Sequence, residues 1–157
     1  MDKLTALIEY ICNFYPVKDH LSNARVTKLV YLTDWRSVLE HGRPITTIRW
    51  EFQHFGPWVD DVVNSARRNP NIEIVHTSTF TGKPKSLFRS VGAPDLTALN
   101  KADMSIADSV IAETQGMFFN QFIEHVYSSY PVASRDRYDV LDLPLIGEEC
   151  RRSGYQF

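Results

Sequence analysis

Residues 24–68 read ARVTKLVYLTDWRSVLEHGRPITTIRWEFQHFGPWVDDVVNSARR and carry the clearest succession of structural signals in the chain. An apolar helical segment is followed by a Gly-Arg-Pro turn, an alternating strand and a Gly-Pro pair that precedes a second helix. All three tryptophans of the 157-residue chain, Trp35, Trp50 and Trp58, lie within it. No catalytic motif does, so the stretch predicts an architecture more directly than an activity.

The first helix of this stretch is predicted to be the centre of the domain. Ser22 or Asn23 can cap its start, and it runs to about Glu40 with Gly42 as its C-terminal stop. Its apolar side chains cover more than half of the circumference, which is typical of a buried helix. They are Val26, Leu29, Val30, Tyr31, Leu32, Trp35, Val38 and Leu39. Its charged exceptions are Lys28, Asp34 and Arg36.

An alternating strand is predicted over residues 45–54, because apolar and polar side chains follow each other with a period of two. Its apolar face is expected to hold Ile48, Trp50 and Phe52. Pro57 is predicted to occupy the first position of the next helix, where its missing N–H costs nothing. That helix is expected to end near Pro70, with a buried stripe formed by Val59, Val62, Val63 and Ala66.

The flanking segments add helices and a hairpin. Apolar periodicity and capping residues predict helices over 2–14, 100–115 and 118–129. The runs 72–80 and 86–91 are predicted to pair as a hairpin and to add to the strand at 45–54. Three strands packed on a helix would be independently stable.

The tail after residue 133 has weak signals. Residues 148–152 are expected to form a turn of helix. Four apolar side chains could dock on the core: Leu141, Leu143, Leu145 and Ile146. The predicted fold is therefore α+β: a mainly helical single domain over 1–157, with a small antiparallel sheet of about three strands packed on a central apolar helix.

Composition favours a cytoplasmic protein without cofactors. The net charge of −2 argues against a general phosphate-binding surface. Cys12 and Cys150 lie far apart and form no C-x-x-C motif, which indicates reduced thiols. We expect no signal peptide and no membrane span, because no apolar run is long enough.

Enzymatic and metal-binding motifs are also missing from the sequence. There is no G-x-S-x-G, no glycine-rich phosphate loop and no histidine pair at ligand spacing, so neither an enzyme nor a metal site is predicted. His54 is the one histidine that merits attention, because it ends the alternating strand on the apolar side. A hydrogen-bonded structural role is the favoured interpretation even there.

Nucleic-acid binding is a weaker hypothesis. Lys83, Lys85 and Arg89 flank the predicted hairpin, as in the wing of a winged helix. However, residues 117–124 offer no lysine or arginine where a recognition helix would enter the groove. A solvated basic hairpin is the favoured interpretation, and nucleic acid is not an expected partner.

Residues 24–68 resemble the Panacea domain, the SocA-like antitoxin family. The matching elements are a K-L-V-Y-L-T-D-W helix, a G-R-P turn, a strand with an aromatic residue and a Gly-Pro pair. The likeness continues more loosely to about residue 132. Its motif positions are Lys28, Leu29, Leu32, Asp34, Trp35, Gly42, Arg43, Pro44, Trp50, Gly56 and Pro57. Its departures are Thr33, His41, Trp58 and the pair Val126-Tyr127.

The resemblance implies a non-enzymatic protein that neutralises a cognate toxin by direct contact, often encoded in prophages or beside the toxin gene. A DNA-binding regulator and an adaptor that delivers its partner to a protease remain as alternatives, and a homo-oligomer is possible. Most motif positions have structural explanations, so the partner-binding surface is expected elsewhere. Because interfaces are rich in aromatic residues and arginine, the candidates are Tyr31, Arg36, Arg49, Phe55 and Trp58.

Overall fold

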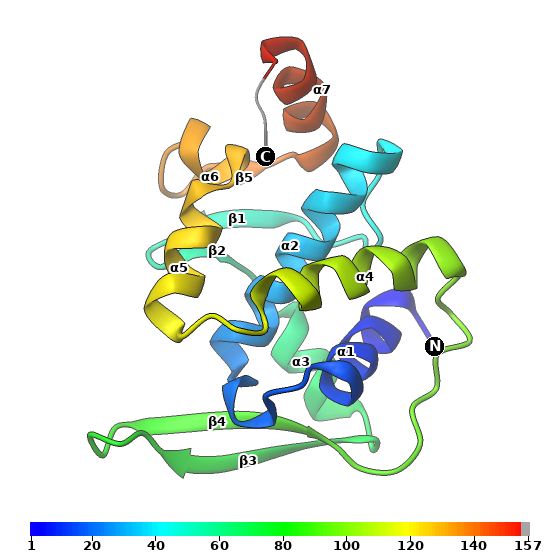
Figure 1. The fold of residues 1–157 in the computed structure, drawn as a ribbon, viewed down its shortest axis with the longest axis vertical. Helices are drawn as coiled ribbons and strands as arrows, with labels where there is room; N and C mark the ends of the chain where they lie inside the picture. The colour runs from blue at the N-terminus through cyan, green and yellow to red at the C-terminus, as the bar shows by residue number, and fades with distance from the viewer. Residues whose placement is uncertain (155–157) are drawn as a thin grey trace.

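Helix α2, Asn23–His41, runs through the middle of the molecule, and the other helices pack around it (Figure 1). The Ser22 hydroxyl caps its start by accepting the Arg25 N–H at 3.1 Å. Gly42 ends it in the left-handed conformation, with φ of 77°, and donates its N–H to the Val38 carbonyl at 2.8 Å. Both predicted ends of the central helix are therefore confirmed.

The computed structural model describes residues 1–154, which form seven α-helices, one 3-10 turn and five short strands. The elements besides α2 are α1 (Lys3–Phe14), η1 (Lys18–His20), β1 (Trp50–Gln53), β2 (Gly56–Trp58), α3 (Asp61–Arg68), β3 (Ile72–Ser78), β4 (Pro84–Ser90), α4 (Lys101–Thr114), α5 (Phe119–Ser128), α6 (Tyr130–Ser134), β5 (Val140–Leu141) and α7 (Leu143–Ser153). The predicted α+β class is confirmed, as are the helices at 2–14, 100–115 and 118–129. Asp2 caps α1 and Asn100 forms a capping box with Asp103 at the start of α4.

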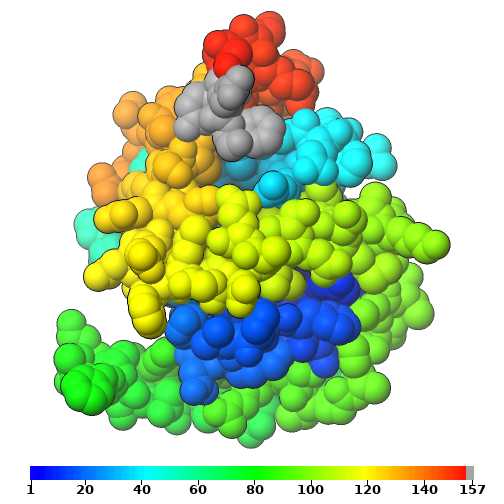
Figure 2. All heavy atoms as spheres, viewed as in Figure 1, coloured from blue at the N-terminus to red at the C-terminus, as the bar shows by residue number. Residues whose placement is uncertain are grey.

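The strands form two separate antiparallel sheets. β1 lies between β2 and β5, whereas β3 and β4 form a two-stranded hairpin of their own. The prediction of the hairpin is confirmed, but the prediction that it adds to the 45–54 strand is wrong. Both edges of β1 are already occupied, and β4 instead contacts the chain just before α2, where the Phe88 N–H donates to the Leu21 carbonyl at 2.8 Å. The tip of the hairpin stands away from the rest of the molecule (Figure 2).

Strand β1 is shorter than predicted, since it begins at Trp50 and not at Ile45. The N–H groups of Ile45 and Thr46 donate to the Asp34 side chain, so they cannot take part in a strand ladder. The prediction that Pro57 opens a helix is also wrong: Gly56–Trp58 is strand β2, and α3 starts at Asp61.

The C-terminal segment is more ordered than predicted and completes the structure around α2. β5 pairs with β1, and α7 is a full helix where only a turn over 148–152 was expected. Gly147 allows the close approach of α7 to α2, since a Cβ there would lie 2.4 Å from Val38 Cγ1. Leu141, Leu143 and Ile146 are buried as predicted, but Leu145 is 54% exposed.

The core is continuous around α2 and includes the rings of Trp35 and Trp50 as well as side chains from α1, α4, α5 and α7. None of the helices in residues 1–154 has the length and apolar character needed to cross a membrane.

Candidate partner-binding site

The carboxylate of Asp34 fixes the chain that follows α2. It accepts the backbone N–H groups of Ile45 and Thr46 at 2.9 Å each, the Thr46 hydroxyl, and the Trp50 indole N–H at 3.0 Å. Asp34 is completely buried, so these donors replace the water that the carboxylate loses on folding. This cluster sets the position of β1, and through it of the β1–β2 hairpin, relative to α2.

A pocket of about 860 Å³ lies between the first half of α2, the β1–β2 hairpin and α5. Its apolar lining is supplied by Phe55 and Trp58 from the hairpin, and by Phe119, Ile123 and Tyr127 from α5. Gln53, His54, Asn120 and Glu124 contribute polar groups. This volume and this mixture of many apolar and few polar groups are typical of binding pockets.

Lys28 is the cation of this pocket, which is referred to below as the Lys28 pocket. Its side chain is buried, with only 2% of the residue exposed, and its Nζ lies 5.1 Å from the centre of the Trp58 ring. Burial in these apolar surroundings lowers the pKa of Lys28 to about 8. Within residues 1–154 no carboxylate lies at ion-pair distance from it.

Gly56 lies beside Lys28 and has a positive φ. Its φ of +100° belongs to the region that glycine adopts without strain, and the hairpin turns there. A Cβ at this position would make ordinary contacts, 3.4 Å from the Tyr127 ring and 3.6 Å from Lys28 Cε. The glycine of the Gly-Pro pair is therefore favoured by the backbone conformation of the hairpin, and not by the start of a helix.

Two of the predicted partner-binding residues border the pocket and one is exposed elsewhere. Phe55 is 76% exposed and Trp58 is half-buried, with its indole N–H donating to Asp60 at 3.2 Å. Arg49 is exposed but borders a different hollow, beside β5 and the start of α7.

The other two predicted residues are held by the fold. Tyr31 is fully buried, packs its ring edge-on against Trp50 and shares a hydrogen bond of 2.8 Å with Ser129. A side chain in this position cannot reach a partner, so the assignment of Tyr31 to a partner-binding surface is wrong. Its apolar ring and its phenol are both used within the core.

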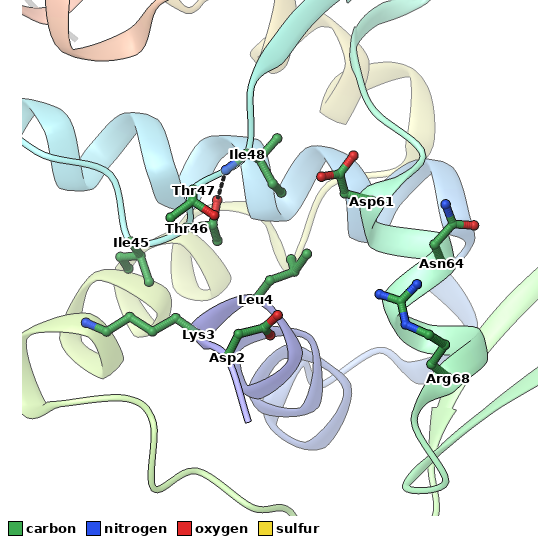
Figure 3. A pocket seen from close by; sticks show the side chains of 10 residues that line it. All are labelled: Asp2, Lys3, Leu4, Ile45, Thr46, Thr47, Ile48, Asp61, Asn64 and Arg68. Carbon is green, nitrogen blue, oxygen red and sulfur yellow. Dashed lines mark hydrogen bonds between the residues drawn. The ribbon is translucent and has the colours of Figure 1, made fainter.

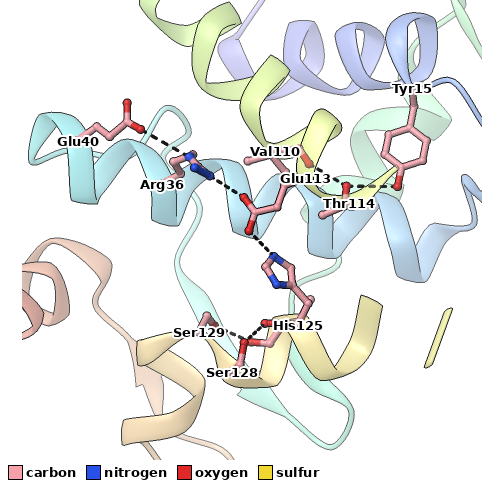
Figure 4. A network of polar contacts seen from close by, with 10 residues as sticks. Tyr15, Arg36, Glu40, Val110, Glu113, Thr114, His125, Ser128 and Ser129 are labelled. Atoms are coloured by element: carbon pink, nitrogen blue, oxygen red, sulfur yellow. Dashed lines mark hydrogen bonds and ion pairs between the residues drawn. The ribbon is translucent and has the colours of Figure 1, made fainter. Parts of the chain in front are cut away.

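Arg36 belongs to a network of polar contacts that joins α2, α4 and α5 (Figure 4). Its Nη1 lies 2.7 Å from Glu113, and Glu113 lies 3.2 Å from His125. Glu40, one turn further along α2, lies 3.5 Å from Arg36 Nε. The guanidinium is thus committed to neighbouring helices, and this network supports the placement of α5 that forms one wall of the Lys28 pocket.

A second cavity, of about 500 Å³, lies between the start of α1, one side of α3 and the segment that follows α2 (Figure 3). Asp2, the N-cap of α1, and Lys3 contribute from one side, and Asp61 and Arg68 contribute from the two ends of α3. Two acids and two bases surround the same space, so the cavity has no preferred charge. It offers a less specific site than the Lys28 pocket.

The described part of the chain has no metal-binding cluster. Residues 1–154 contain no group of three or more His, Cys, Asp or Glu side chains that could hold a metal ion. Burial raises the pKa of the Cys12 thiol to about 12, which leaves it unreactive. His54 is exposed, and its ring packs edge-on against Phe55 at 4.5 Å between centroids.

Sequence reasoning identified Lys28 as a motif residue and placed Tyr127 on a helix face, but it did not bring them together at one site. One signal was available: Lys28 is an isolated cation in a strongly apolar helix, and Asp34, six residues away, does not face it. The contribution of α5 depended on tertiary packing, which no local pattern encodes.

Comparison with known protein families gives one clear result. The sequence model of the family described as "Antitoxin SocA-like, Panacea domain" matches residues 26–131. No curated protein and no solved structure matches the chain. The matched region contains α2 from Val26 onward, the β1–β2 hairpin and α5, and with them every residue that lines the Lys28 pocket except Ala24. Since this match covers more than half of the sequence, the chain belongs to the antitoxin SocA-like, Panacea domain family.

Proposed function

We propose that this protein is an antitoxin that neutralises a cognate toxin by binding it directly, without catalysis. The toxin contacts the rim of the Lys28 pocket, where Phe55 and Trp58 provide the anchoring surface. The protein acts in the cytoplasm, where two unpaired thiols such as Cys12 and Cys150 stay reduced.

The observation that carries this proposal is an exposed aromatic surface on a chain of an antitoxin family. Phe55 is 76% exposed beside the half-buried ring of Trp58, and both border an apolar pocket. Large aromatic side chains that are accessible around a concave apolar site are characteristic of protein interfaces.

The DNA-binding alternative has less support. The hairpin that resembles a wing carries Lys83 and Lys85, but the Lys85 ammonium already donates to the Asp19 carbonyl at 3.1 Å. The net charge of −2 also disfavours a strong attraction to phosphates. An adaptor that delivers its partner to a protease would use the same protein-binding surface, so it differs from the proposal only in the fate of the partner.

The test is co-expression with the product of the neighbouring gene, which for a prophage-borne pair is expected to be the toxin. The neighbouring protein alone should arrest growth, and wild-type antitoxin should restore it while the two proteins co-purify. Recovery of growth with disappearance of the toxin would assign the adaptor role. Recovery without any complex, or a shift of the promoter DNA that weakens steeply with salt, would contradict the proposal in favour of a regulator.

A further inference from the structure

We propose that the Lys28 pocket accepts a segment of the partner protein in which an acidic side chain is flanked by apolar side chains, with its carboxylate pairing with the Lys28 ammonium. This inference rests on the proposed function and specifies the chemistry that the toxin must present. Lys28 would then determine which partner binds, while the surrounding aromatic residues supply contact area.

The charge of the pocket is uncompensated in the free protein. Lys28 is almost completely buried, and its ammonium lies over the Trp58 ring. The ionisable groups that share the pocket are His54, Glu124 and Tyr127, and none of them forms an ion pair with Lys28 within residues 1–154. A buried cation without a counter-ion is costly, and an incoming carboxylate would supply that counter-ion.

The apolar surface extends beyond the cavity itself. Phe119, on the α5 side, is 47% exposed, and Phe55, on the hairpin side, is more exposed still. Both rings line the pocket, so a small molecule enclosed there would cover them only in part, whereas a polypeptide segment that passes through the pocket would cover more of each. Gln53 and Asn120 at the same site can hydrogen-bond to the backbone of such a segment.

The carboxylate is expected on a side chain and not at a chain end. An acidic side chain within a segment can reach Lys28 while the apolar residues before and after it contact Phe55, from the hairpin, and Phe119, from α5. A chain end has residues on one side alone and would cover one of the two rings. This difference can be measured directly.

The probes are three short peptides. The first is acetyl-Phe-Glu-Phe-amide, the second is acetyl-Phe-Gln-Phe-amide, and the third is acetyl-Phe-Gln-Phe with a free carboxyl end. Binding is followed by NMR of isotope-labelled protein through the indole N–H signals. Trp58 lines the pocket, whereas Trp35 and Trp50 are buried in the core and serve as internal references.

The glutamate peptide should shift the Trp58 signal with a millimolar dissociation constant and leave the two reference signals in place. The uncharged glutamine peptide should bind at least tenfold more weakly. In Lys28→Met the preference between these two peptides should disappear, and in the control Lys83→Met, which removes an exposed cation at the hairpin tip, it should persist. Equal binding of the two peptides to the wild type, or no binding at all, would overturn the inference.

Other occupants give other results. If the free-carboxyl peptide binds as well as the glutamate peptide, the pocket recognises a chain end. This result would contradict the inference that it binds an acidic side chain. If sedimentation shows a dimer that Lys28→Met dissociates, the occupant is a second copy of this chain. Failure of the proposed function is distinguishable: the peptides would bind as described, but wild-type protein would not restore growth against the neighbouring toxin.

Discussion

Replacement of Lys28 by methionine should make the protein more stable. Methionine keeps most of the length of the lysine stem but carries no charge, so it removes the penalty for burying the ammonium. A fall in the pKa from the ordinary value of 10.5 to about 8 corresponds to roughly 3 kcal/mol. Loss of the contact between the ammonium and the Trp58 ring offsets about 1 kcal/mol of this. The expected gain in the free energy of unfolding at neutral pH is therefore about 2 kcal/mol.

The gain should depend on pH in a defined direction. Above pH 8 the folded protein releases the Lys28 proton, whereas the unfolded chain keeps it until about pH 10.5. Within this window the unfolded state binds more protons, so the wild type becomes more stable relative to the variant as pH rises. The advantage of Lys28→Met should be constant below about pH 8 and should shrink between pH 8 and 10.5.

The assay is urea denaturation of both proteins at neutral pH and at about pH 10, with Lys83→Met as the matched control. Comparing variants at the same pH cancels the titration of all other groups. The control should change the unfolding free energy by less than about 0.5 kcal/mol at either pH. A destabilised Lys28→Met protein at neutral pH, or an advantage that does not shrink with pH, would refute the argument that Lys28 is buried as an unpaired cation.

Three further predictions concern the scaffold and the rim. Asp34→Asn leaves one buried donor facing an NH₂ group and should lower the free energy of unfolding, measured by urea denaturation, by about 2–3 kcal/mol. An unchanged urea midpoint would contradict the role of Asp34 in anchoring the segment after α2. Gly147→Ala places a Cβ 2.4 Å from Val38 Cγ1. It should lower the melting temperature by an amount that corresponds to about 1–3 kcal/mol in the free energy of unfolding. The double variant that also carries Val38→Ala should recover part of this loss. Phe55→Ala should change stability by less than about 0.5 kcal/mol but weaken partner binding about tenfold. In the same binding assay, Phe80→Ala at the exposed hairpin tip should have no effect, and equal losses for both would contradict a specific role of Phe55.

Local signals explain why most helices could be predicted from the sequence. Ser22, Gly42 and Asn100 are capping residues whose preference depends on nearby backbone groups, and each does what its side chain or conformation favours. The same reasoning failed at Pro57. A proline after glycine suits a helix start and a short edge strand equally well, and only the pairing of β2 with β1 distinguishes them.

Long-range pairing explains the remaining errors. The strand at 45–54 was shortened because a buried Asp34 carboxylate competes for its backbone donors, a contact across eleven and twelve residues. The third strand of that sheet comes from Val140–Leu141, far along the chain and too short to give a periodic signal. Tyr31 was assigned to an interface because aromatic composition does not distinguish a core ring from an exposed one.

The most direct test of the Lys28 pocket as the working surface is neutralisation by Lys28→Met in cells that produce the neighbouring toxin. The variant should accumulate at least as well as the wild type because it is more stable, yet it should fail to restore growth. Lys83→Met, at matched protein level, should restore growth fully. Full protection by Lys28→Met would contradict the account, because it would show that the toxin is neutralised without the buried cation.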